Sequence, residues 1–166
     1  MRAIEIALKR PFPSAKLKWR RGQGGSGELV YITARDVMDR LDEVFGPAGW
    51  QTEFEWIGER MVCQLSCQIE GNWVTKCDGA DDTNIEAAKG GLSDSFKRSA
   101  VMWGVARYLY YPGAFNSRKE PASWATPEGF DKLMVSRQGK EREDWSREYD
   151  RASKDIRGPD TKKRRK

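Results

Sequence analysis

The chain carries few of the side chains that make or break covalent bonds. Its 166 residues include no histidine, and neither its serines nor its three cysteines have an evident activating partner. Nucleophilic catalysis and acid–base catalysis by histidine both require such partners. We therefore expect that the protein is not an enzyme and that it needs no cofactor.

One acidic group has the composition of a metal site. Asp78, Asp81, Asp82 and Glu86 lie close together in the sequence, and clustered carboxylates are the ligands that Mg²⁺ takes in a nuclease. The same residues precede a predicted helix, where negative charge complements the helix dipole. We favour this second, structural role and predict no metal site, with a Mg²⁺-dependent nuclease as an alternative.

A second group of side chains is suited to a nucleic-acid backbone, because basic and aromatic residues are interleaved in two stretches. Its members are Lys16, Lys18, Trp19, Arg20, Arg21, Tyr31, Lys97, Arg98, Arg107 and Tyr108. Lysine and arginine neutralise phosphates, and aromatic faces stack on bases without reading the sequence. Lys89 would share a helix face with Lys97. A Lys-Arg pair on a helix is also common on ordinary solvated surfaces.

The net charge of +5 is unevenly distributed along the chain. Residues 1–27 contain seven lysines and arginines against one glutamate, whereas residues 28–115 contain eight basic and fourteen acidic side chains. Residues 116–166 contain fifteen basic and ten acidic side chains. An anion-binding surface must therefore draw on the N-terminal segment, a few helix positions and the tail.

The cysteines and the N-terminal segment indicate the cellular compartment. Cys63, Cys67 and Cys77 are odd in number and form no CxxC motif, so we interpret them as reduced core residues. Residues 1–13 are too short and too charged for a signal peptide or a membrane span. We expect a soluble, cytoplasmic protein.

One long helix, over residues 83–111, must position the second basic stretch. Thr83 and Glu86 form a capping box at its start. Its apolar stripe consists of Ile85, Ala88, Leu92, Phe96, Ala100, Trp103 and Tyr110. Glycines inside a helix are costly, so Gly90 and Gly91 indicate close approach of a strand, a neighbouring subunit or a phosphate chain. We assign this small-residue face to subunit packing.

The preceding sequence predicts a short helix or irregular arm over residues 1–13, then a hairpin of residues 16–21 and 29–32. Thr33 caps a second helix that ends at Phe45. Alternating apolar residues predict three strands, 50–56, 61–70 and 73–77, with Gly71-Asn72 as a two-residue turn. The fold class is therefore α+β, in the order β-β-α-β-β-β-α, with the long helix covering a three-stranded antiparallel meander.

Two parts of the chain differ in composition. Residues 1–115 are expected to form one folded domain, and residues 116–166 a flexible, charged C-terminal tail. Within the tail, four apolar residues keep a helical spacing, so a short helix over 141–157 is the alternative to a solvated chain.

Two blocks of sequence occur together at a defined spacing. The first is Tyr31-Ile32, followed after the predicted helix by Val44-Phe45-Gly46-x-x-Gly49-Trp50. The second is Glu86-Ala87-x-Lys89 with Ser93-Asp94-x-Phe96-Lys97-Arg98-Ser99-Ala100. In this order they resemble the annealing domain of the Rad52/Rad22 recombination family, and the helix is most similar to that of its short phage-encoded members. The resemblance spans about residues 10–112.

This resemblance implies a protein of homologous recombination and double-strand break repair. Such a protein binds single-stranded DNA and anneals complementary strands without ATP, as a closed homo-oligomeric ring that holds the strand in an outer basic groove. The implied setting is the cytoplasm of a bacterial or phage-infected cell. The tail would be the segment that meets a single-strand-binding protein or an exonuclease of the host or phage.

The resemblance also implies roles for individual residues. Lys97 and Arg98 match the family's basic pair at the groove floor, Arg21 matches a hairpin arginine with Arg20 as an adjacent substitute, and Tyr31 matches a groove tyrosine. Val101 stands where the family has a further arginine, and the lysine of a second, outer DNA site has no clear counterpart. The predicted DNA-binding residues are Lys97, Arg98, Arg20, Arg21, Tyr31, Lys89, Lys16, Lys18 and Arg107.

A double-stranded RNA- or DNA-binding module is the main alternative, because it shares the α-β-β-β-α order. Such modules place the basic N-terminus of a helix across phosphates. Here the segment that leads into the predicted helix is acidic, and Lys97 and Arg98 lie several turns further along. This arrangement favours a groove at the middle of the helix.

Overall fold

The computed structural model describes residues 2–22, 27–81 and 87–136 and divides the chain into two compact units, Met1–Leu109 and Tyr110–Lys166. The elements are α1 (Arg2–Lys9), η1 (Ser14–Lys16), β1 (Lys18–Arg21), β2 (Glu28–Tyr31), α2 (Ala34–Phe45), β3 (Trp50–Ile57), β4 (Arg60–Ile69), β5 (Asn72–Asp81), α3 (Ala87–Trp103), η2 (Arg107–Tyr110), η3 (Ser123–Ala125) and α4 (Pro127–Ser136). This order confirms the predicted α+β class. No helix in the described ranges is long and apolar enough to span a membrane.

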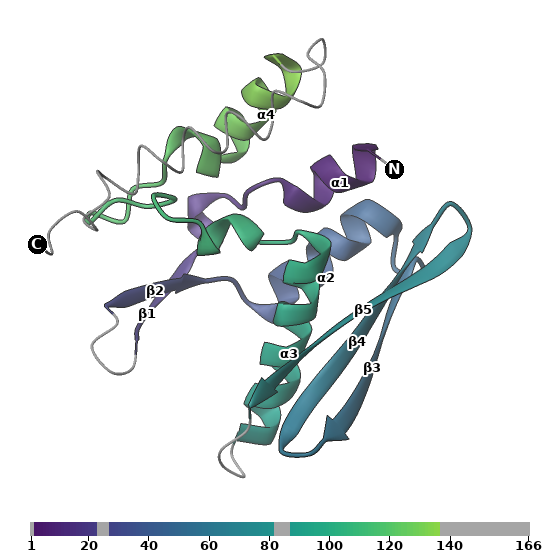
Figure 1. Ribbon diagram of the computed structural model, residues 1–166. Helices are drawn as coiled ribbons and strands as arrows, with labels where there is room; N and C mark the ends of the chain where they lie inside the picture. Colours follow the sequence, from purple (N-terminus) through teal and green to yellow (C-terminus); the bar gives the residue numbers. More distant parts are fainter. Residues whose placement is uncertain (1, 23–26, 82–86, 137–166) are drawn as a thin grey trace, which may run out of the picture. The chain divides into compact units, whose positions relative to one another are not determined.

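Strands β3, β4 and β5 form the predicted antiparallel meander, with β4 in the centre (Figure 1). The apolar residues of β4 that face α3, Met61, Cys63, Leu65 and Cys67, are all buried. Ile69 pairs with Asn72, so the tight turn consists of Glu70 and Gly71, both at positive φ, and not of Gly71-Asn72 as predicted. Positive φ at both turn residues matches the twist of the flanking strands.

Helix α3 packs on β4 and β5 through its smallest residues. Gly91, Ser95 and Ser99 follow each other at steps of four and are buried within the unit. The Ser99 hydroxyl donates to the carbonyl of Cys63 at 2.7 Å and accepts from the amide of Asp78 at 3.0 Å, which joins the helix to both strands. These residues serve packing inside the chain, so the assignment of the small-residue face to subunit packing is wrong for this part of it.

The long helix is shorter at its C-terminal end than the sequence predicted. It ends at Trp103, because Gly104 adopts a φ of 106° and the amide of Val105 bonds to the carbonyl of Ala100. Tyr110 is 70% exposed, and Leu92 is 40% exposed, so neither belongs to the buried stripe. The buried stripe is Phe96, Ala100 and Trp103. The predicted start at Thr83 and its capping box with Glu86 lie outside the described residues.

Helix α2 begins and ends as predicted. Thr33 accepts from the amide of Asp36, and the Asp36 carboxylate accepts in turn from Thr33, which completes a capping box. After the helix, Gly46 has a φ of 72°, and a side chain at Gly49 would clash with the carbonyl oxygen of Phe45. Trp50 then donates to Asp42 and stacks on Phe96 of α3. The Gly46-x-x-Gly49-Trp50 motif therefore has a structural role.

The hairpin β1–β2 and helix α1 are also present, as the sequence predicted. The second unit contains η3 and α4, which lie in the segment for which the sequence predicted a flexible, charged tail. Thr126 precedes α4, where its hydroxyl accepts from the amide of Gly129 and its carbonyl accepts from Phe130. The helix considered over residues 141–157 and the terminal basic run lie outside the described residues.

We predict that Gly49→Ala lowers the free energy of unfolding by about 1–3 kcal/mol, because the new methyl group must displace the Phe45 carbonyl. Urea denaturation measures this loss. Gly90→Ala is the matched control, since a methyl group there meets nothing within 4 Å and alanine favours the helix by up to about 1 kcal/mol. Equal effects of the two substitutions would contradict the steric argument.

Candidate nucleic-acid interface

The hairpin and helix α3 bring basic side chains together around one aromatic ring. The Arg20 guanidinium carbon lies 5.8 Å and the Lys97 Nζ atom 5.7 Å from the centre of the Tyr31 ring. Lys18 lies directly across the hairpin from Tyr31. We call Lys18, Arg20, Tyr31 and Lys97 the cationic cluster. It joins residues of β1 and β2 to a residue of α3 that lies more than sixty positions further along the sequence.

The register of the hairpin decides which arginine enters the cluster. Lys18 pairs with Tyr31, Arg20 with Leu29 and Arg21 with Glu28. Side chains alternate between the two faces of a strand, so Lys18 and Arg20 share the face of Tyr31, while Arg21 lies on the opposite face. The structure therefore places Arg20, and not Arg21, beside Tyr31.

Two cations lie close to the aromatic ring of Tyr31. Two cations within 6 Å of one ring are at the distance at which the ring quadrupole attracts them. This geometry draws Arg20 and Lys97 to the same ring. The ring can thus order the cations of the cluster, a role that differs from the base stacking expected of the interleaved aromatic residues.

Lys97 and Arg98 are neighbours in sequence but point to different partners. Lys97 Nζ forms an ion pair with Asp94 Oδ1 at 2.9 Å, one turn earlier in α3. An Arg98 terminal nitrogen pairs with Asp78 Oδ1 on β5 at 3.2 Å. Consecutive helix residues lie about 100° apart, so the pair spreads over the helix surface and only Lys97 belongs to the cationic cluster.

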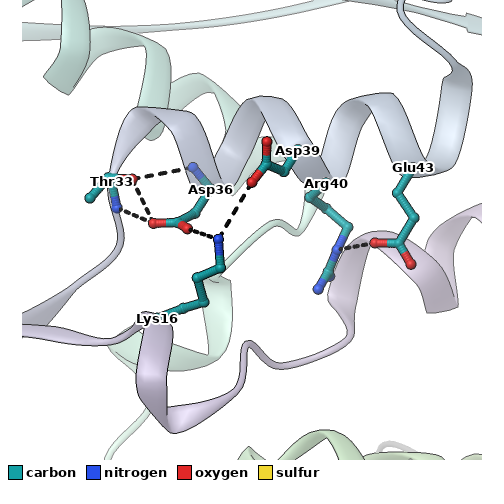
Figure 2. A network of polar contacts seen from close by, with 6 residues as sticks. All are labelled: Lys16, Thr33, Asp36, Asp39, Arg40 and Glu43. Carbon is teal, nitrogen blue, oxygen red and sulfur yellow. Dashed lines mark hydrogen bonds and ion pairs between the residues drawn. The ribbon is translucent and has the colours of Figure 1, made fainter.

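Lys16 forms ion pairs with two aspartates of α2 (Figure 2). Its Nζ atom lies 2.9 Å from Asp36 Oδ1 and 3.5 Å from Asp39 Oδ2. Hydrogen bonding to Asp36 raises the pKa of Lys16, with the charge of Asp36 as the next cause. Lys16 thus links the segment before the hairpin to the start of α2 and does not join the cationic cluster.

Arg40 is a structural cation that sequence reasoning missed. It is buried, and it donates to the carbonyls of Ala7 and Arg10, which lie at the end of α1 and just after it. Its guanidinium also lies over the Phe12 ring at 4.4 Å. Figure 2 shows its ion pair with Glu43. Burial lowers the pKa of Arg40, while Glu43 opposes this effect. Arg40 therefore fastens the N-terminal segment to α2.

Two further cations serve the C-terminal end of α3. Arg107 donates to the carbonyls of Val101 and Met102 at 2.8 and 2.7 Å. Lys76 of β5 donates to the same Met102 carbonyl at 3.1 Å and lies over the Trp103 ring. Cations at this end of a helix satisfy its free carbonyls and complement its dipole. Arg107 was predicted as a DNA contact, and these bonds give it a structural role.

The other predicted functional groups are less defined. Lys89 lies in the first turn of α3, but its side chain is outside the description. Among the side chains that the structure describes, no three from Cys, Asp and Glu could hold a metal ion; the side chains of Asp81, Asp82 and Glu86 lie outside this description.

The cysteines are confirmed as core residues in two of three cases. Cys63 and Cys67 are buried and unbridged, and burial raises their pKa to about 11 and about 12. They therefore stay protonated and unreactive at neutral pH. Cys77 is exposed, because it lies on the face of β5 that points away from α3. Its interpretation as a core residue is wrong.

Comparison with known proteins identifies the family to which this arrangement belongs. The sequence matches the Rad52/22 family of double-strand break repair proteins over residues 1–121. The chain belongs to the Rad52/22 family. The match includes the hairpin, the meander and all of α3, and therefore every member of the cationic cluster.

Two relatives of this Rad52/22 family member carry the name single-stranded DNA-binding protein DdrA. The protein of Deinococcus deserti is 29% identical over 143 residues, which are 75% of this chain and 71% of the relative. The protein of Deinococcus radiodurans is 32% identical over 114 residues, 64% of this chain and 54% of the relative. The chain thus spans about half the length of the second relative.

We predict that the network around Asp36 makes the fold sensitive to acid. Burial alone would raise the pKa of Asp36, but hydrogen bonds from Thr33 and Lys16 outweigh burial and hold the pKa below the ordinary 3.8. The unfolded chain therefore takes up this proton first, so the stability contributed by Asp36 is present above about pH 4 and lost as the pH falls further.

Urea unfolding at pH 6 and pH 3 tests this pH dependence. Asp36→Asn should lose less stability between the two pH values than the wild type, because it has no carboxylate to protonate. Asp39→Asn is the control, since it leaves the Thr33–Asp36 capping box intact and should follow the wild type. An Asp36→Asn variant with the wild-type loss would show that Asp36 does not carry the acid sensitivity.

Proposed function

We propose that the protein binds single-stranded DNA through the cationic cluster, with Arg98, the next residue of α3, as a further phosphate contact, and that it anneals complementary strands. The observation that supports this most is the meeting of Arg20, Tyr31 and Lys97 on the surface of a Rad52/22 family fold. Arginine and lysine directed at the backbone screen the repulsion between two phosphate chains and leave the base edges open for pairing. The relatives named single-stranded DNA-binding proteins agree with this ligand.

Annealing makes no covalent bond, so the proposed activity requires neither ATP nor a catalytic group. The setting would be recombination and repair in the cytoplasm of a bacterial or phage-infected cell. The family match favours this function over a double-stranded RNA- or DNA-binding module. The proposed Mg²⁺-dependent nuclease loses support, because Asp78 already pairs with Arg98 and accepts from the amide of Gly79.

The double variant Arg20→Ala with Lys97→Ala should weaken binding to single-stranded DNA by about 1–3 kcal/mol, because two phosphate contacts are lost. The slope of log affinity against log salt should fall by roughly 0.7 for each contact. Fluorescence anisotropy with a labelled oligonucleotide at several salt concentrations measures both quantities.

The matched control is Arg21→Ala with Arg35→Ala, which removes the same charge from exposed positions outside the cluster. This control should bind within about twofold of the wild type, a difference below 0.5 kcal/mol. Equal weakening by both pairs would show that net charge, and not the cluster, determines binding. Incubation of the oligonucleotide with Mg²⁺ should leave it uncut, and cleavage would restore the nuclease hypothesis.

We further infer that copies of the chain assemble into a closed ring. The contact that we propose between neighbouring copies is the open face of β3. Phe54 and Trp56 lie on the sheet face that α3 covers, but α3 packs on β4 and β5 and leaves them 42% and 52% exposed. β3 is also an edge strand of the meander. Exposed apolar patches of this kind mark protein interfaces, and ring closure needs two different surfaces of each subunit to meet.

Light scattering tests the assembly. Phe54→Ser should reduce the mass of the oligomer, because it removes apolar area from the proposed contact. Ile57→Ser is the control, since Ile57 is 56% exposed but lies on the opposite face of β3. A monomeric wild type, or an unchanged mass in Phe54→Ser, would exclude this contact. The contact of residues 116–166 with a single-strand-binding protein or an exonuclease stays a prediction.

A further inference from the structure

Lys97 and Arg98, two cations that α3 would offer to DNA, already have anionic partners. Asp94 and Asp78 lie 2.9 and 3.2 Å from Lys97 and Arg98, and both carboxylates reach solvent, with side chains 48% and 33% exposed. The Lys97 and Arg98 side chains are 25% and 53% exposed. A phosphate that approaches either cation must therefore displace the carboxylate or share the cation with it. Both the phosphate and the carboxylate are negatively charged.

The strength of these pairs decides whether a phosphate can compete. Ion pairs that water can reach are weak, because solvent screens the attraction and the side chains lose freedom. Such pairs cannot block a phosphate, but each subtracts from the free energy of DNA binding. The carboxylates also repel the incoming phosphate directly, because the like charges would lie only a few ångströms apart and water screens their repulsion only in part.

We propose that Asp94 and Asp78 are built-in competitors of the DNA phosphates, which weaken the hold on each phosphate so that a paired strand can leave. This inference rests on the proposed binding of single-stranded DNA. An annealing protein must release the duplex that it forms, and a surface of unopposed cations would retain it. The two aspartates supply a fixed opposing charge where the contact is made.

A different role for the carboxylates would be to hold Lys97 and Arg98 in place. For Lys97 this role is not needed, because the Tyr31 ring lies 5.7 Å from its ammonium group and remains when Asp94 is neutralised. The two roles predict opposite changes in DNA affinity when the carboxylate is removed. Loss of a competitor tightens DNA binding, whereas loss of a positioning group weakens it.

The experiment compares Asp94→Asn and Asp78→Asn with the wild-type chain in binding a labelled single-stranded oligonucleotide. Asparagine keeps the size of the side chain, and at position 78 its carbonyl oxygen can still accept from the amide of Gly79, as the carboxylate does at 2.7 Å. Each variant should bind about two- to fivefold more tightly, with most of the change in the dissociation rate. Release of annealed duplex should slow by a similar factor.

Glu55→Gln is the matched control, because it removes one negative charge from the sheet face opposite α3. Aspartate variants that bind no more tightly than Glu55→Gln, or more weakly than the wild type, would overturn the inference while single-strand binding stands. A wild-type chain that fails to bind the oligonucleotide would instead refute the proposed function. Circular dichroism confirms that each variant is folded, and the two aspartate positions test the inference independently.

Discussion

The close approach of α3 to the sheet is the constraint on which the first unit depends. A helix can lie this near to two strands only where its contact residues are small, and Gly91, Ser95 and Ser99 provide that face. The buried Ser99 hydroxyl bonds to the backbone of both β4 and β5, so a polar group inside the core is satisfied. This contact fixes the rotation of α3 and thereby the directions of Lys97 and Arg98.

A separate set of contacts positions the hairpin beside α3. Arg40 holds the carbonyls at the end of α1, the Tyr108 hydroxyl accepts from the amide of Phe12 at 3.1 Å, and Lys16 joins Asp36. A buried charge is costly unless its hydrogen bonds are made, and Arg40 makes them to backbone carbonyls and Glu43. The N-terminal segment is therefore held at several points before the chain enters β1.

Local patterns predicted the elements well, and long-range geometry explains what they missed. Alternation in β3 to β5 and the Thr33 cap depend on neighbours in the chain, and both were found. The choice of Arg20 over Arg21 depends on the hairpin register, which the glycine-rich sequence between the two strands does not specify. The apolar spacing continues past Trp103, so periodicity could not reveal the end of α3. Arg40 is buried by a distant segment, which no local pattern shows. For Lys76 a signal was present, because the alternation of β5 places this lysine on the face that α3 covers.

The pairing of Lys97 and Arg98 with carboxylates also sets the range over which this surface acts. Two opposite charges about 3 Å apart form a dipole, whose field falls faster with distance than that of a single charge. Salt confines it further, since the screening length is about 8 Å under physiological conditions. This part of the protein would therefore attract a strand only at near contact. The long-range capture of DNA, and with it the association rate, would depend on the unpaired excess of positive charge elsewhere in the chain.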